Sequence, residues 1–223
     1  MTVKIQGNGK IVSEVDGVAF RAQRVVAKPI DYTTAGHYLD TAVTGVITAG
    51  ATPPAEFYQF RWTSSSVIAI INRIRISVST ASSTFFPAGV PLQLAIYKST
   101  SWTVSGTGGT TLTVDGTAKL RTSMASSAVG DFRIATTAAL GAGTKTLEAN
   151  PFTTLVASCP LASSTSGQIV APGTVMMEAN TANGAHPMIL AQNEGFSLSL
   201  LAIPATASWI FSLEVLWAEA TQY

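Results

Sequence analysis

The last apolar stretch of the chain, SWIFSLEVLWAEATQY, constrains the fold more than any other feature. Every second position in it is large and apolar: Trp209, Phe211, Leu213, Val215 and Trp217. A period of two with an unbroken apolar face is typical of a β-strand that covers a hydrophobic core, whereas a helix would have no polar face here. The stretch therefore predicts a central or inner-face strand, with both tryptophans buried in the core or against another subunit.

Segments earlier in the chain alternate in the same way. VIAIINRIRISVS predicts a strand with one apolar face made of Ile68, Ile70, Ile74, Ile76 and Val78, and with Arg73 and Arg75 on the other face. VPLQLAIY predicts a second strand with Leu92, Leu94 and Ile96 pointing inward. β-Branched residues dominate these segments, which favours strands over helices.

The remaining apolar segments are short and separated by turn residues; they read EFYQFRW, FTTLVASC, TVMME, PMILA and GFSLSLLAI. The pattern indicates about eight to twelve short strands, and only KLRTSMASSA suggests a short helix. We therefore predict an all-β chain folded as an antiparallel β-sandwich, with a jelly roll as the first choice. No repeat of 20–50 residues is present, which argues against a propeller or a β-helix.

Charge and composition divide the chain unevenly. The first forty residues hold nine of the twenty-five charged side chains. We predict a charged N-terminal hairpin or arm over 1–30, with Asp16-Gly17 as the turn between KIVSEV and VAFRAQRVV. A single sandwich domain is predicted over 31–223, beginning with turns and loops over 31–56. Within it, just over half of residues 99–146 are Ser, Thr or Gly, which predicts a loop-rich insertion.

Many of the side chains on the surface of this protein must be small and uncharged. The chain has 223 residues, of which 47% are hydrophobic and only 11% charged, against about 25% charged in an ordinary soluble domain. A Ser/Thr-rich surface of the kind that many all-β proteins have would explain this composition. We favour the alternative that neighbouring chains cover several faces, because a free monomer usually relies on surface charge for solubility.

Net charge and apolar tracts also exclude some partners. A net charge of +1 gives no field that would recruit nucleic acid or an acidic membrane. Arg61 among aromatic residues is discounted as a nucleic-acid contact, because its neighbours Phe60 and Trp62 are apparent core residues.

The sequence also shows no targeting or membrane segment. The start MTVKIQGNGK has no apolar segment of a signal peptide. Pro204 breaks the apolar tract over 195–213, so we predict no membrane helix. The expectation is a soluble protein made in the cytoplasm.

Residues that could carry chemistry are few and scattered. His37 stands three residues before Asp40, and His186 has no possible ligand near it in the sequence, so neither follows the spacing of a metal site. The single cysteine, Cys159, cannot form an internal disulfide and is interpreted as a small buried hydrophobe. No Gly-x-Ser-x-Gly motif occurs.

Two further patterns have some features of a functional site. GAGTKT over 141–146 resembles a phosphate loop but has Thr144 before Lys145 and no strand-to-helix context. Glu56, Glu178 and Glu194 could pair as the carboxylates of a glycosidase, but solvated loop acids are the favoured interpretation. We therefore predict no catalytic, cofactor-binding or metal-binding residue, no cofactor, and a protein that is not an enzyme.

Four segments taken together resemble virion structural proteins of tailed bacteriophages: VKIQGNGKIVSEVDGVAFRAQRVVAKPIDY, EFYQFRWTSSSVIAIINRIRIS, LRTSM and NEGFSLSLLAIPATASWIFSLEVLWAE. Small all-β members of that set include head decoration or cement proteins, which are commonly jelly rolls and frequently trimers. The resemblance implies a location on the capsid surface, synthesis in the host cytoplasm, and two partners, the major capsid protein and further copies of this chain. It transfers no functional residue.

The resemblance leaves a second function open, a tail or baseplate module that binds a receptor glycan. Sugar sites on β-sandwiches favour exposed aromatic side chains, and Trp102 in STSWTVSG is the candidate. A small hydrolase is the third and least favoured class. Residues 1–28 combine an excess of positive charge with alternating Ile and Val. They fit either an arm that pairs with a neighbouring chain or an edge hairpin of the same domain.

Overall fold

The computed structural model describes residues 2–6, 10–14, 36–47, 54–81, 91–114, 118–157, 169–180, 184–203 and 208–221. The chain divides into two compact units, Met1–Asp31 and Tyr32–Tyr223. In the first unit, β1 (Thr2–Gln6) pairs antiparallel with β2 (Lys10–Glu14) as a two-stranded sheet of its own. The predicted Asp16-Gly17 turn lies outside the described residues.

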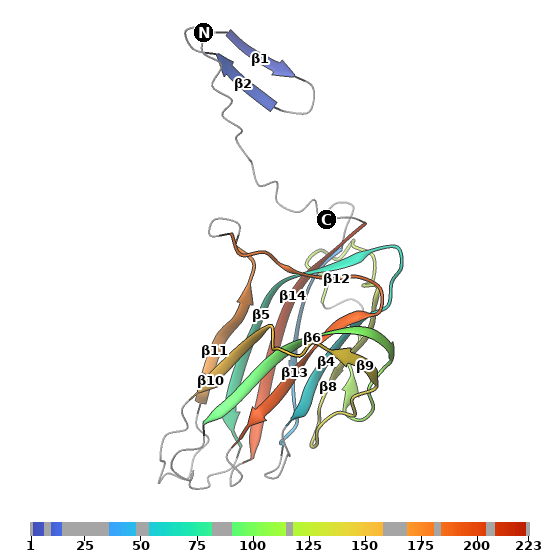
Figure 1. The fold of residues 1–223 in the computed structure, drawn as a ribbon, viewed down its shortest axis with the longest axis vertical. Helices are drawn as coiled ribbons and strands as arrows, with labels where there is room; N and C mark the ends of the chain where they lie inside the picture. Colours follow the sequence, from blue (N-terminus) through green and yellow to red (C-terminus); the bar gives the residue numbers. More distant parts are fainter. Residues whose placement is uncertain are drawn as a thin grey trace. The chain divides into compact units, whose positions relative to one another are not determined.

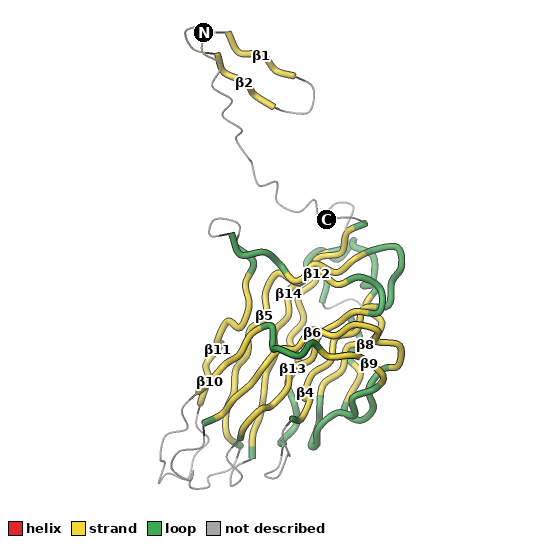
Figure 2. Tube along the Cα trace, viewed as in Figure 1, coloured by secondary structure: helices red, strands yellow, loops and turns green. Residues whose placement is uncertain are grey.

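The second unit consists of two antiparallel sheets (Figures 1 and 2). The larger sheet has the order β10 (Thr153–Ala157), β6 (Leu92–Val104), β13 (Glu194–Ala202), β4 (Ala55–Trp62), β8 (Val129–Ile134) and β7 (Thr110–Thr111), and β9 (Thr144–Leu147) also pairs with β6. The smaller sheet has the order β11 (Ile169–Glu178), β5 (Ile68–Thr80), β14 (Trp209–Ala220) and β3 (His37–Val43), and β12 (Met188–Leu190) also pairs with β5. The predicted antiparallel β-sandwich is confirmed.

The described residues contain strands and loops but no helix, so none of them forms a helix that could cross a membrane. The predicted short helix in KLRTSMASSA is wrong. Residues 118–128 instead form turns beside β3, where the amide of Leu39 donates to the carbonyl oxygen of Ala118, and the amide of Leu120 donates to that of His37. Pairing to the edge of a sheet therefore replaces the helical hydrogen bonds that this segment would otherwise make.

The C-terminal stretch forms β14, and its predicted apolar face is confirmed. All five alternating residues from Trp209 to Trp217 are buried in one hydrophobic core cluster. β14 lies between β5 and β3, so it is a central strand as well as an inner one. Across the two sheets, Phe57 stacks on Phe211 with ring centroids 5.0 Å apart, and the edge of Phe60 meets Trp217 at 5.4 Å.

β5 departs from the predicted alternation at a β-bulge. Opposite β5, Leu216 pairs with Arg73 while the next residue, Trp217, pairs with Ile71, so Asn72 is the extra residue. One extra residue reverses which side chains face the core. Ala69 and Ile71 therefore join the core together with Ile74, Ile76 and Val78. The prediction that Ile68 and Ile70 share this core face is wrong.

Two segments expected to be rich in loops contribute strands. HYLDTAV within 31–56 forms β3, an edge strand whose register places His37 opposite Ala218 and Val43 opposite Ser212. Residues 99–146 include the end of β6, all of β7 and β8, and all but the last residue of β9. β8 pairs with β4 and adds Phe132 and Ile134 to the core, so this Ser/Thr/Gly-rich stretch forms part of the larger sheet.

Candidate functional site

β4 separates aromatic from polar side chains by means of a bulge. Its partner β13 places Leu198 opposite Tyr58 and the following residue, Ser199, opposite Glu56, so Phe57 is the extra residue. Phe57 and Tyr58 consequently both belong to the core. The side chains of Glu56, Gln59 and Arg61 lie on the outer face of the larger sheet, where their hydrogen-bond partners are found.

The outer face of the larger sheet carries a buried polar layer, which we define as Glu56, Gln59, Ser99, Asp131, Ser197 and Ser199. The register aligns its members across neighbouring strands, since Ser197 stands opposite Gln59 and Ser199 stands opposite Glu56. A sheet face of this polarity would ordinarily be exposed to water. The layer is buried because chain segments from the Ser/Thr/Gly-rich region fold over it.

We call residues 102–108 and 141–145 the covering segment. Its two parts are joined by a hydrogen bond from the amide of Gly141 to the carbonyl oxygen of Thr107. Glycines permit the close approach: a Cβ at Gly106 would collide with the Gln59 carboxamide, and one at Gly195 on β13 would collide with the Trp102 ring. The glycine-rich composition of this region predicts a flexible loop, but in the structure its glycines allow the chain to pack closely against a sheet.

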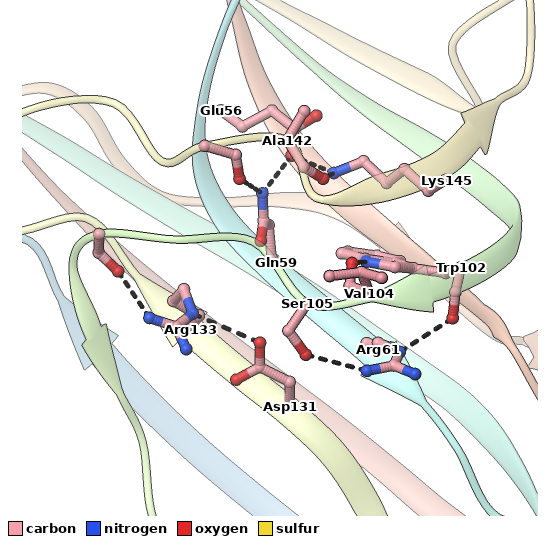
Figure 3. Close-up of polar contacts among 12 residues, drawn as sticks. Glu56, Gln59, Arg61, Trp102, Val104, Ser105, Asp131, Arg133, Ala142 and Lys145 are labelled. Atoms are coloured by element: carbon pink, nitrogen blue, oxygen red, sulfur yellow. Dashed lines mark hydrogen bonds and ion pairs between the residues drawn. The ribbon is translucent and has the colours of Figure 1, made fainter.

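The centre of the site is a group of four residues that we call the Lys145 cluster: Lys145, Glu56, Gln59 and Trp102 (Figure 3). Lys145 Nζ lies 2.5 Å from Glu56 Oε2 and donates to the Ala142 carbonyl oxygen at 2.8 Å. Gln59 Nε2 donates to the same Glu56 Oε2 at 2.6 Å and to the Gly141 carbonyl oxygen at 2.9 Å. Glu56 therefore accepts hydrogen bonds from an ammonium group and an amide through one oxygen.

Burial changes the electrostatics of Lys145. Its side chain is only 2% exposed, and Nζ lies 4.2 Å from the centroid of the Trp102 ring. Desolvation lowers the pKa of Lys145, and the hydrogen bond and charge of Glu56 act in the opposite direction without cancelling that shift. The amine is thus closer to its neutral, nucleophilic form than a lysine in water.

Arg61 binds the covering segment instead of a ligand. Its Nε and Nη2 donate to the carbonyl oxygens of Trp102 and Thr103, both at 2.9 Å, and Nη1 donates to Ser105 Oγ at 3.0 Å. Arg133 makes a similar connection from β8, donating to the Gly108 carbonyl oxygen at 2.7 Å. Both guanidinium groups hold the covering segment to the sheet (Figure 3).

The structure contradicts the role foreseen for Trp102 as an exposed aromatic contact for glycans. The side chain is fully buried over Gly195, and its indole N–H donates to the Val104 carbonyl oxygen at 3.0 Å. Its ring contacts the Lys145 ammonium instead of solvent. Trp102 is therefore a packing residue of the Lys145 cluster.

The two histidines are not brought together with other ligands. His37 is half-buried at the start of β3, where burial lowers its pKa, and an odd spacing puts it on the opposite face of the strand from Asp40. His186 is exposed in the loop before β12. Cys159 lies outside the described residues. Within the described part of the chain, no three His, Cys, Asp or Glu side chains gather as possible metal ligands.

The three carboxylates considered for a glycosidase have different surroundings. Glu178 is exposed at the end of β11, with Oε1 4.0 Å from Arg73 Nη1. Glu194 accepts a hydrogen bond from the amide of Ala191 in a turn. Glu56 is the exception, because it is buried and paired with Lys145, so its interpretation as a solvated loop acid is wrong. The structure does not bring these three acids together.

Another buried carboxyl group, that of Glu219, lies at the end of β14. Glu219 accepts hydrogen bonds from Ser127 Oγ at 2.5 Å, from the amide of Ala128 at 3.1 Å and from Trp217 Nε1 at 3.3 Å. Burial raises the pKa of Glu219, although these three donors lower it. Together with burial, the nearby charge of Glu219 raises the pKa of Tyr38 to about 12. Glu219 therefore acts as an acceptor that fixes residues 127–128 against the sandwich.

Sequence reasoning missed the Lys145 cluster because its members come from distant segments. One local signal was present: Gln59 and Arg61 alternate with aromatic residues in EFYQFRW, which predicts one polar strand face. Glu56 stands at an odd spacing from both and reaches that face only through the bulge at Phe57. Nothing in GAGTKT indicated that Lys145 would be buried against that face.

Comparisons with known proteins add no relative. No protein-family model matches the chain, and neither a curated protein nor a solved structure matches it.

Proposed function

We propose that this chain is a virion structural protein of a tailed bacteriophage, a cement or decoration protein that stabilises the head through protein–protein contacts. Its partners in this proposal are the major capsid protein and further copies of itself, with a trimer as the working state. The observation that carries the proposal is the order of the strands in the sandwich.

Eight strands define this order. In chain sequence they are β3, β4, β5, β6, β10, β11, β13 and β14. The smaller sheet takes the first, eighth, third and sixth of them, and the larger sheet takes the second, seventh, fourth and fifth as neighbours. We infer a jelly roll from this arrangement, with β7, β8, β9 and β12 as additions. Jelly rolls occur in viral capsid proteins, lectins and cupins.

A fold alone does not select among these classes. The capsid class is favoured by the resemblance of the N-terminal and C-terminal segments to phage virion proteins, and by the sparse surface charge. The N-terminal unit gives further support. An isolated two-stranded hairpin is marginally stable in water, so β1 and β2 gain stability if they dock on another chain.

Apolar side chains on the surface also suit contacts with other subunits. Val156 is 63% exposed on β10, an edge strand of the larger sheet, and Val43 is 57% exposed on β3, an edge strand of the smaller one. Edge strands with exposed apolar residues favour pairing with another chain. By contrast, the burial of Trp102 removes the aromatic side chain on which the glycan-binding alternative depended.

Quantitative mass spectrometry of purified virions of the encoding phage tests the proposal. We expect this chain in a copy number comparable with that of the major capsid protein, and we expect it in head particles that lack tails. A copy number of only a few per particle, with the chain in the tail fraction, would favour the tail or baseplate alternative. Absence from purified virions would contradict both.

A further inference from the structure

The Lys145 cluster brings an amine, a carboxylate and a carboxamide together in a site that excludes water. Lys145 Nζ and Gln59 Nε2 contact the same oxygen of Glu56, at 2.5 Å and 2.6 Å. Gln59 is fully buried, and the side chain of Lys145 is nearly so. An ordinary ion pair requires only Lys145 and Glu56. The third member, a buried amide that shares their oxygen, gives the cluster the components of an acyl-transfer reaction.

We propose that Lys145 and Gln59 form an intramolecular amide cross-link, with Glu56 as the proton carrier. In this reaction Lys145 Nζ is the nucleophile, Gln59 Cδ is the electrophile and Gln59 Nε2 is the leaving group. The modification joins β9 to β4 across the outer face of the larger sheet. It rests on the geometry of the cluster and does not depend on the partner proposed above.

The atoms of this step balance without an oxidant, a reductant or a second substrate. Glu56 Oε2 takes one proton from the Lys145 ammonium, and the neutral Nζ attacks Gln59 Cδ to form a carbon–nitrogen bond. The bond between Cδ and Nε2 then breaks, and Nε2 leaves with the electron pair. Glu56 carries two protons in succession from Nζ to Nε2. The products are the Nζ–Cδ amide, ammonium and the original Glu56 carboxylate.

The surroundings favour each part of this reaction. Desolvation lowers the pKa of Lys145, which favours proton transfer to Glu56 and so a neutral amine. The Trp102 ring and the Ala142 carbonyl oxygen hold Nζ next to the carboxylate. The carboxamide of Gln59 is held next to Nζ, because its Nε2 donates to the same Glu56 Oε2 that Nζ contacts, while its buried carbonyl oxygen has no hydrogen-bond partner among the described residues.

Gln59 is a better acyl donor here than Glu56, although Glu56 is also next to Nζ. An ionised carboxylate resists attack by an amine, and condensation with Glu56 would consume the group that carries the protons. The position of Glu56 between the two nitrogens fits a carrier of protons from the nucleophile to the leaving group.

Mass spectrometry of the purified full-length protein tests the cross-link. We expect the intact denatured protein to be lighter than its sequence mass by one ammonia molecule, after allowance for the initiator methionine. In a tryptic digest, cleavage after Lys145 should be blocked. A branched peptide should join the peptide that ends at Arg61 to the one that contains Lys145.

Three variants separate the chemistry from simple packing. Lys145→Met and Glu56→Gln should each have their full sequence mass and no branched peptide. Lys98→Met removes a different lysine, one on β6 that pairs with Glu148 at 3.8 Å, and should keep the loss of ammonia. Circular dichroism of each variant should retain the β-sheet spectrum. If a variant fails to fold, the wild-type mass and peptide map still decide the question.

Several results would overturn the proposal. A folded wild-type protein with its full sequence mass would show that the cluster is only an ion pair with an amide neighbour. Loss of water together with a link between Lys145 and Glu56 would show that Glu56, and not Gln59, is the acyl donor. A branched peptide that persists in Glu56→Gln would remove Glu56 as the proton carrier.

Discussion

At the scale of single residues, this protein stabilises the buried glutamates Glu56 and Glu219 in different ways. Glu56 is paired with a cation, Lys145, while Glu219 has only neutral donors around it. Hydrogen bonds to a buried carboxylate offset part of the desolvation penalty, whereas a close cation adds direct charge compensation. This difference explains why burial dominates at Glu219 and raises its pKa.

The raised pKa of Glu219 predicts how stability depends on pH. The native state holds a proton on Glu219 more tightly than the unfolded chain, whose carboxyl group has a pKa near 4.5. Its contribution to the free energy of unfolding is therefore fully present below that pH and is lost as pH rises through the folded pKa. Glu219→Gln has no such titration, so wild-type stability relative to this variant should fall with increasing pH.

Urea unfolding of both proteins at a series of pH values measures this difference. The comparison between the two proteins cancels the titrations that they share, including those of Asp40 and His37. Wild-type stability that increases with pH relative to Glu219→Gln would contradict the assignment of burial as the main cause.

At the scale of elements, bulges decide which side chains reach the core. The bulge at Asn72 in β5 directs Ile71 inward, and the bulge at Phe57 in β4 lets two successive aromatic residues face the core. The second bulge also turns Glu56 and Gln59 to the same outer face. Simple alternation cannot foresee either effect, because each bulge reverses the inward and outward positions that follow it.

The bulge in β5 predicts unequal effects of two isoleucine substitutions. Ile71→Ala removes a fully buried core side chain and should lower the free energy of unfolding by about 2–5 kcal/mol. Ile68→Ala changes a half-buried residue outside the core cluster and should have less than half of that effect. Equilibrium unfolding in urea measures both. A larger loss of stability for Ile68→Ala than for Ile71→Ala would mean that β5 follows simple alternation, with Ile68 facing the core, and would contradict the bulge.

At the scale of the whole molecule, the chain combines a sandwich that has its own core with a separate N-terminal unit. Residues 32–223 contain all the residues of the core cluster. The covering segment belongs to the sandwich as well, because its contacts are with β4 and β8. We therefore expect the N-terminal unit to take part in binding and not in the core.

Deletion of residues 1–31 tests this division. We expect the remaining chain to unfold cooperatively at a temperature close to that of the full protein, because its core is intact. Binding to capsids that lack this protein should be lost, and co-sedimentation measures it. A truncated chain that does not fold would mean that β1 and β2 complete the sandwich. The hypothesis of an arm that pairs with a neighbouring chain would then be wrong.

We also expect the protein to self-associate as a trimer. Charged side chains are sparse, and several large apolar residues are exposed on the sandwich, including Val43, Val104 and Val156. Burial of such residues between copies would offset the entropy lost on association. Light scattering coupled to size exclusion should give the trimer mass at tens of micromolar. A monomer there would restrict any trimer to the capsid surface and contradict the prediction for the free protein.

The sequence by itself determined the elements whose patterns are local. Alternation over 209–217 and 92–96 depends only on neighbours along the chain, so it predicted the strands, their inner faces and the β-sandwich. Composition likewise predicted a charged N-terminal hairpin or arm, and the Asp16-Gly17 turn of that hairpin lies outside the described residues. β3 was missed because Asp40 interrupts its inward row of apolar residues.

Only the tertiary structure decided the features that depend on distant segments. The order of the strands, the two bulges and the segments lying over the outer face all follow from pairing between residues far apart in the chain. Lys145 and Glu56 are separated by 89 positions, and neither carries a local mark of burial. A lysine in a glycine-rich stretch is ordinarily solvated, and here it becomes a buried amine only because that stretch packs against a polar sheet face.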